Sequence, residues 1–200
     1  MKGRQHCDEK YVKVNGKDCY DLNCTDNITK YQTAHLFVEK RTKKKCEQFF
    51  KQVKDSSYDQ ILACYKKEKH KPMKKRKLFT FVFDGFKNYK SSWSKLFYRV
   101  TKCTAGVSIA CKKYGLKHNN NASERYNGKL KDVLNGMRGS FKSFEYAEVF
   151  MNLQNIMNNF VNPHQQLQGK TPAEAAEIIL PLGRNKILGL IKYLINHSDD

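Results

Sequence analysis

Residues 78–85 read LFTFVFDG, a compact apolar run that ends at an aspartate and a glycine. A run of this length and composition is typical of a strand that is buried on both faces. A helical pattern follows at about residues 87–98, and another strand is expected at residues 107–110. Because a strand, a helix and a strand in succession form a right-handed crossover, these segments predict a pair of parallel strands.

The first third of the chain predicts an antiparallel meander beside that parallel pair. An Asn-Gly dipeptide at residues 15–16 separates two strand-like runs within residues 9–24, and it is a strong signal for a two-residue hairpin turn. With this turn, the numbers of facing residues add up to 31, which sets Cys7 opposite Cys24. A third run at residues 33–38 adds a neighbouring strand.

After the meander, the spacing of the apolar residues changes from that of a strand to that of a helix. Apolar residues spaced as on one face of a helix follow Thr42, which is the expected N-cap. Residues 54–77 are polar and end in a basic run. We interpret this stretch as a solvated or DNA-facing loop, with a nuclear-import signal as the alternative.

Four more helical segments follow the crossover. They begin near Asn121 and Ser143, at a capping box opened by Thr171, and near Arg184. The apolar sides of the first and the last of these segments comprise Ala122, Tyr126, Leu130, Val133 and Met137, and Ile187, Leu188, Ile191, Leu194 and Ile195. The whole pattern predicts an α/β fold with a mixed five-stranded sheet, in which an antiparallel meander joins parallel strands and helices flank the sheet.

The charge of the chain restricts its partners. The 200 residues include 38 Lys and Arg against 19 Asp and Glu, which gives a formal net charge of +19. Because such an excess of positive charge repels itself, it favours an anionic partner, with nucleic acid the first candidate and an anionic membrane surface the second. The sequence has no apolar run near the length of about 20 residues that a spanning helix needs, and its N-terminus lacks the apolar core of a signal peptide.

Cysteine usage indicates a reducing compartment. The chain has seven cysteines, an odd number, and no two of them form a Cys-x-x-Cys pair. This pattern argues against a disulfide framework and against a zinc ribbon, and it favours reduced thiols in a cytosolic protein.

Three carboxylates stand out in this basic chain. Asp8 lies inside the first strand, Asp84 ends the most apolar strand, and Glu124 lies near the start of a helix. Carboxylates that converge from three elements at one edge of a sheet would bind hard divalent cations, and two such ions can catalyse phosphodiester chemistry. The alternatives are ordinary structural roles, since an Asp after a strand often caps a turn and a Glu in the first turn of a helix often stabilises the helix dipole.

Several segments match a known family in the order and spacing of its motifs. They are HCDEKYVKVNGK (6–17), FDGFKNY (83–89), HNNNASERYNG (118–128), MRG (137–139), NFVNPH (159–164) and GKTPAEA (169–175). Over about residues 6–177, the chain resembles the catalytic domain of bacterial and archaeal insertion-sequence transposases of the DDE type, which are related to retroviral integrases.

This resemblance implies an RNase H-like fold and a DNA transposase in which Asp8, Asp84 and Glu124 hold two Mg²⁺ or Mn²⁺ ions per site. Water cleaves a phosphodiester at the end of the element, and the freed 3′-hydroxyl attacks target DNA. The family often has a basic residue seven positions after its Glu, and Lys131 holds that position. Lys131 is therefore expected to hold a DNA phosphate beside the metal ions. The further candidates for DNA contact are Arg125, Lys129 and Asn121.

The resemblance also implies partners and a domain organisation. The partners are double-stranded DNA, as element ends and target, and further copies of the chain, in the cytoplasm and on the nucleoid of a prokaryote. Residues 1–160 would form the RNase H-like catalytic core, and residues 161–200 would form a helical extension packed on it. Family members normally carry an N-terminal segment that reads the element ends, whereas only seven residues precede Asp8. The chain alone is therefore expected to show little preference for any end sequence.

Two other functions remain open at this point. A catalytically idle, truncated relative could bind DNA or a full-length partner and inhibit transposition. A structure-specific nuclease could use the same fold and the same metal site, because fold and metal site do not fix the substrate.

Overall fold

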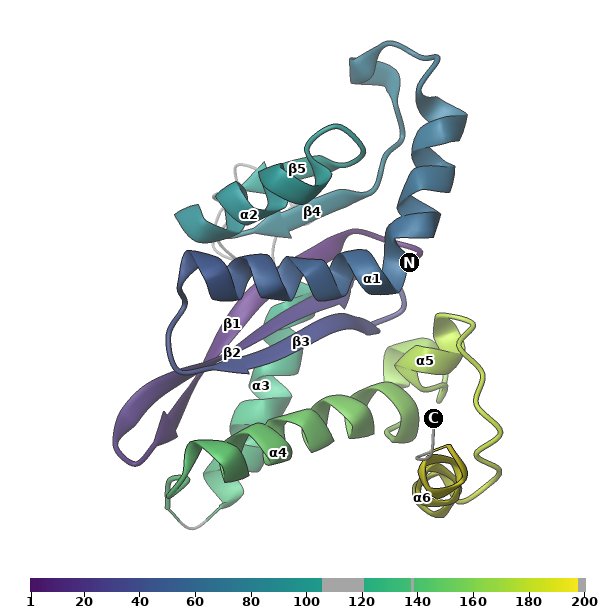
Figure 1. Ribbon diagram of the computed structural model, residues 1–200. Helices are drawn as coiled ribbons and strands as arrows, with labels where there is room; N and C mark the ends of the chain where they lie inside the picture. Colours follow the sequence, from purple (N-terminus) through teal and green to yellow (C-terminus); the bar gives the residue numbers. More distant parts are fainter. Residues whose placement is uncertain (106–120, 138, 198–200) are drawn as a thin grey trace.

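A five-stranded mixed sheet forms the centre of the protein, with strand order β3-β2-β1-β4-β5 (Figure 1). The computed structural model describes residues 1–105, 121–137 and 139–197. The strands are β1 (Gln5–Val14), β2 (Lys17–Asp26), β3 (Gln32–Val38), β4 (Thr80–Phe83) and β5 (Lys102–Ala105). The first three strands are antiparallel, whereas β4 runs parallel to both β1 and β5. This arrangement confirms the fold class predicted from the sequence.

The hairpin between β1 and β2 has the predicted turn and register. Asn15 and Gly16 both adopt the left-handed conformation, with φ of 47° and 76°, which a two-residue hairpin turn of this kind requires. Cys7 lies opposite Cys24, as the sequence predicts. Both are free thiols in the structure, with their sulfur atoms 3.4 Å apart. The strand expected at residues 107–110 lies outside the described residues.

Helices cover both faces of the sheet. They are α1 (Lys43–Glu68), α2 (Lys87–Phe97), α3 (Asn121–Gly136), α4 (Phe144–Ile156), α5 (Pro172–Ala175) and α6 (Lys186–Asn196). α1 and α2 pack on one face over a core of aromatic and aliphatic side chains, and α3 and α4 pack on the other face over a smaller core. Within the described part of the chain, no helix has both the length and the hydropathy that crossing a bilayer requires.

α1 is longer than the sequence pattern suggested. The interpretation of residues 54–77 as a loop is wrong for residues 54–68, which continue the helix that begins after Thr42. Figure 1 shows that α1 first lies across the sheet and then bends away from it. The hydroxyls of Ser56 and Ser57 both donate to the carbonyl of Val53 near this bend. Such side-chain bonds back to the preceding turn often bend a helix.

The buried sides of α3 and α6 differ from the expected apolar sides. On α3, Tyr126 and Leu130 are buried as expected, but Val133 and Met137 are exposed, while Ser123 and Asn127 are buried. The polar residues are buried because the sheet beneath α3 presents polar side chains, which the hydrophobic pattern cannot detect. On α6 all five expected apolar residues are exposed, and the buried residue is Leu190.

Candidate active site

Asp8 lies on the face of β1 that α3 and α4 cover. Side chains alternate along a strand, so Asp8 shares a face with Val12 and Val14, which belong to the core beneath these two helices. The amide of Asn127 on α3 donates a hydrogen bond of 3.0 Å to Asp8 Oδ2. Asn23, which faces Asp8 on β2, donates in turn to Asn127 Oδ1 at 3.1 Å. The Asp8 carboxylate is therefore held by a two-amide chain from the neighbouring strand and helix.

Asp84 lies beside Asp8 along the parallel pair of strands. Gln5 pairs with Phe81 and His6 with Val82, where the pairing ends. Continued by two residues, the same offset would set Asp8 level with Asp84. The Asp84 side chain is exposed, and its Oδ1 accepts a hydrogen bond of 2.9 Å from the backbone N–H of Phe86. Asp84 therefore has the structural role that the sequence left open, since it caps the turn after β4.

Glu124 comes to the site from α3. The preceding residue, Ser123, donates a hydrogen bond of 2.7 Å from its hydroxyl to the carbonyl of His6 on β1. This bond fixes the first turn of α3 against the strand that carries Asp8. Glu124 is half-buried, and burial raises the pKa of its carboxyl.

The electrostatics of Asp8 indicate that Asp84 and Glu124 both lie near it. Burial, followed by the negative charges of Asp84 and Glu124, raises the pKa of the Asp8 carboxyl to about 7. The hydrogen bond from Asn127 acts in the opposite direction. A buried carboxylate that two other carboxylates repel favours the binding of a cation, because a cation removes the repulsion.

The donor set suits a hard divalent ion, although the carboxylates are not gathered around one point. Carboxylate oxygens from Asp8, Asp84 and Glu124 are the ligand type that Mg²⁺ prefers. Among the residues that the structure describes, no three Asp, Glu, His or Cys side chains are gathered closely enough to hold one ion between them. The fit to Mg²⁺ therefore rests on ligand chemistry and charge.

Lys131 lies near Lys10, which in turn lies near Asp8. Burial and the nearby charge of Lys131 lower the pKa of Lys10, while the charge of Asp8 raises it. Lys10, Lys13 and Lys131 line a hollow of about 420 Å³ between β1 and α3. The three lysines give this hollow a positive charge, and none of the three carboxylates lines it.

Arg125 and Lys129 occupy a different side of α3. Burial lowers the pKa of His164, and the charges of Lys129, Lys30 and Arg125 lower it further. These four basic residues form a cluster of their own, to which α3 contributes Arg125 and Lys129. Asn121 begins α3, but its side chain is not among those that the structure describes.

Arg41 is a residue near the site that sequence reasoning missed. Its guanidinium forms an ion pair with Glu9 and lies over the rings of Tyr20 and Phe86, each 4.6 Å from its carbon to the ring centre. Its carbonyl accepts a hydrogen bond from Asn88 at 3.0 Å. Arg41 thus fastens the turn after Asp84 to the sheet, and no local sequence signal marks this role.

Asn127 was missed for a different reason. It lies three residues after Glu124, so both side chains project from the same side of the helix. The helical stripe that contains Glu124 and Lys131 could have identified it as a neighbour of the carboxylates.

Comparisons with known proteins bear on the family and on the fold of the chain. A family model described as a DDE domain, DDE_Tnp_IS240, matches residues 3–164. A search of curated proteins found no match. The magnesium complex of the HTLV-2 integrase catalytic core domain, in its trimeric form, has a similar structure, with a TM-score of 0.53 and 14% identity over 86% of this chain and 95% of that chain. Its dimeric form gives a TM-score of 0.51 at 14% identity, over 85% and 92% of the two chains. The fold is thus that of an integrase-type catalytic core.

Proposed function

The chain belongs to the DDE domain family of insertion-sequence transposases, and from this premise we propose that it cleaves and joins DNA with Asp8, Asp84 and Glu124 as its catalytic carboxylates. The observation that carries the proposal is the electrostatic coupling of Asp8 to both other acids, which come from separate elements of the fold. The register of β1 and β4 supports it further, because the same offset continued beyond the paired residues would bring Asp8 level with Asp84.

The three carboxylates would hold divalent cations. We propose Mg²⁺ or Mn²⁺, two ions per site, with Asp8, Asp84 and Glu124 as ligands. The chemistry that such ions supply when bound is activation of the attacking oxygen and stabilisation of the leaving oxygen of a phosphodiester. The protein's own contribution is to place the carboxylates, and Asn127 and Ser123 support this placement through their bonds to Asp8 and to the β1 backbone.

The proposed reaction consists of two phosphoryl transfers. In the first, water displaces the 3′-oxygen of a phosphodiester and leaves a free 3′-hydroxyl. In the second, this hydroxyl displaces a 3′-oxygen in target DNA and forms a new phosphodiester. Both steps depend on positioning and on neutralising phosphate charge. Lys131 is suited to bind a phosphate because it lines a positively charged hollow with Lys10, whose own neighbour is Asp8.

Partners and organisation complete the proposal. The partners would be duplex DNA, contacted also by Arg125, Lys129 and Asn121, and further copies of the chain. Residues 1–160 would form the catalytic core and residues 161–200 a helical extension. The setting would be the prokaryotic cytoplasm, where thiols stay reduced.

The proposal is tested by a strand-transfer assay that needs no known element end. A duplex oligonucleotide with a free 3′-hydroxyl is incubated with supercoiled plasmid and the protein, in Mg²⁺, in Mn²⁺ or in EDTA. Joined and nicked plasmid should form with either metal and disappear in EDTA. Asp84→Asn should abolish both products, because the amide preserves the acceptor for the Phe86 N–H but loses the charge.

The matched control is Asp59→Asn, the same change at an exposed position on α1. It should leave both products unchanged. If Asp84→Asn remains as active as Asp59→Asn, Asp84 is not a catalytic residue. If the unaltered chain binds DNA but gives neither product with either metal, the protein is instead a catalytically idle relative of the transposases.

A further inference from the structure

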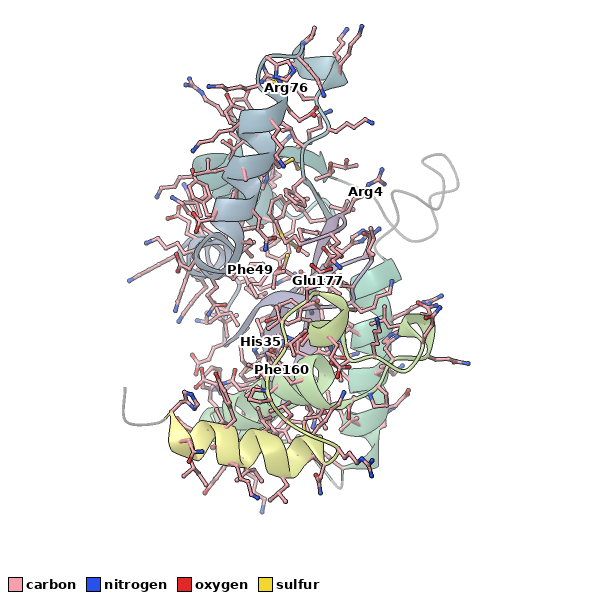
Figure 2. All side chains as sticks on the ribbon, turned by 90° about the vertical axis from the view of Figure 1, so that its right-hand side faces the viewer. Arg4, His35, Phe49, Arg76, Phe160 and Glu177 are labelled. Atoms are coloured by element: carbon pink, nitrogen blue, oxygen red, sulfur yellow. The ribbon has the colours of Figure 1, made fainter. Side chains whose placement is uncertain are left out.

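Residues 62–77, which we call the basic arm, project from the body of the protein. The arm contains the outer end of α1, the turn that follows and the short helix η1 (Met73–Lys75). Ile61 is the last buried residue of α1, and Leu78 is the next buried residue along the chain. In Figures 1 and 2 the arm lies at the opposite end of the molecule from α4 and α6. The arm therefore contributes no buried side chain to either core.

The turn of the arm is held in a defined shape by a few of its own residues. Glu68 receives hydrogen bonds from Lys71 Nζ at 2.6 Å and from the backbone N–H of Lys77 at 2.8 Å. The guanidinium of Arg76, labelled in Figure 2, donates to the carbonyls of Lys71 and Lys69 at 2.8 and 2.7 Å. The single acid of the arm and its single arginine are thus both used to close the turn.

The other charges of the arm have no intramolecular counterpart. The arm has seven lysines and one arginine against one glutamate. Six of the lysines are exposed and form no side-chain hydrogen bond or ion pair within the described structure, and they are Lys66, Lys67, Lys69, Lys74, Lys75 and Lys77. Concentrating like charges on an ordered projection costs free energy, and an anionic partner removes that cost.

We propose that the basic arm binds the phosphate backbone of duplex DNA, as a contact surface separate from the catalytic carboxylates. The choice of DNA rests on the proposed function. The charge pattern itself fits a phosphate backbone, because lysines act as point charges for phosphates and carry no base specificity. An anionic membrane is less suitable, since Met73 is the one large apolar side chain exposed at the described tip of the arm.

The arm and the carboxylates lie at opposite ends of β4. The chain enters β4 from Lys77 and leaves it at Asp84, so the two residues are at most about 25 Å apart along an extended chain of seven steps. At 3.4 Å per base pair, this distance corresponds to about seven base pairs of duplex. One duplex can therefore contact the site and the arm together, which would add affinity without adding sequence preference.

The experiment measures the salt dependence of binding to a 40-base-pair duplex in EDTA, with no cleavage. The arm variant is Lys67→Gln/Lys74→Gln/Lys75→Gln. The matched control is Lys51→Gln/Lys142→Gln/Lys192→Gln, which removes three exposed lysines elsewhere. If each arm lysine meets one phosphate, the arm variant should lower the log-log salt slope by about two to three units, and its Kd at 0.1 M salt should rise roughly a hundredfold or more. The control should lower the slope by less than one unit.

The arm proposal and the proposed function fail in different ways. Equal loss of slope in the arm and control variants would overturn the arm proposal, because binding would then follow net charge alone. The proposal would also be overturned if the arm variant bound the duplex as tightly as the unaltered chain but no longer bound equimolar phosphatidylcholine–phosphatidylserine vesicles. That result would assign the arm to a membrane surface. The binding experiment measures no cleavage, so its result does not depend on activity. A chain that proved inactive in the strand-transfer assay would overturn the proposed function, and the binding result for the arm would still hold. Equal urea midpoints for the two variants establish that both are folded.

Discussion

Replacing Asn127 with alanine should destabilise the protein more than any exposed substitution on α3. The change removes a hydrogen bond of 3.0 Å to the Asp8 carboxylate, and bonds to charged groups contribute about 1.5–3 kcal/mol. It also removes the acceptor of the Asn23 amide, whose next contact, the Asp21 carbonyl, is 3.5 Å away. A buried donor left without a partner costs about 1–3 kcal/mol. Because neighbouring losses do not add fully, we expect a total of about 2–4 kcal/mol.

The assay is urea unfolding without divalent cations, with the control Asn135→Ala, at about one pH unit above the Asp8 pKa of about 7 so that this carboxyl is ionised. Asn135 is exposed on the same helix, so its replacement should change the free energy of unfolding by no more than about 0.5 kcal/mol. The slope against urea should stay the same in both variants, since a changed slope would indicate a different unfolded or native state.

A second variant separates hydrogen bonding from shape. Asn127→Asp keeps the size of the side chain and an acceptor for Asn23, but it sets a further carboxylate against Asp8. It should therefore be less stable than the unaltered chain, and the difference should shrink on acidification, as the two carboxyls become protonated. The reasoning is refuted if Asn127→Ala costs no more than Asn135→Ala, or if Asn127→Asp is as stable as the unaltered chain.

Two further predictions concern charge. Lys131→Ala should lower the maximal rate of strand transfer by at least about tenfold while lowering the salt slope of binding by only about one unit, and an equal loss of rate in Lys129→Ala would contradict this special role. Burial raises the pKa of Asp26, but backbone N–H groups of Gly3, Thr29 and their neighbours outweigh it and hold that pKa below its ordinary value. The stabilisation from Asp26 is then present above the unfolded pKa of about 3.9 and is lost as the pH falls below it. Asp26→Asn should accordingly cost about 1–3 kcal/mol at pH 7 and almost nothing near pH 2, as measured by urea unfolding across that range.

Local signals predicted the parts of the fold that local physics decides. The dipeptide at residues 15–16 fixed the register of the whole β1–β2 hairpin, because a two-residue turn leaves one pairing of the strands. The apolar run that ends at Asp84 predicted β4, because few other structures bury so short and apolar a segment. Its parallel partner β5 lies at Lys102–Ala105, before the residues 107–110 at which the sequence placed a strand. The capping box at Thr171 is present with both of its hydrogen bonds. In each case a few neighbouring residues determine the outcome.

The outer half of α1 could not be predicted in this way. Between Val53 and Leu78 the chain buries just Ser57 and Ile61, so the apolar spacing that identifies a helix is absent. The helix continues because the preceding turns are already formed and because Gln60, Leu62, Ala63 and the residues 66–68 have good helical propensity. A hydrophobic pattern reveals which side chains are buried, and a helix that projects from the protein buries almost no side chains.

The site itself lies where the hydrophobic pattern fails, and the register explains why. Asp8, Asn23 and His35 face one another across β1, β2 and β3, and they form a polar row on the face beneath α3 and α4. His35 is kept in this row by its ion pair with the buried Asp21, and Asp8 is kept there by Asn127. A sheet face with such a row reads as solvent-exposed in the sequence, although two helices cover it. Burying polar groups costs free energy unless each has a partner, so the polar row depends on these hydrogen bonds and ion pairs. The proposed catalytic Asp8 lies at the end of the row that is next to β4. On this face of the sheet, simple patterning gives the wrong answer at the positions that hold the proposed catalytic Asp8 and its polar partners.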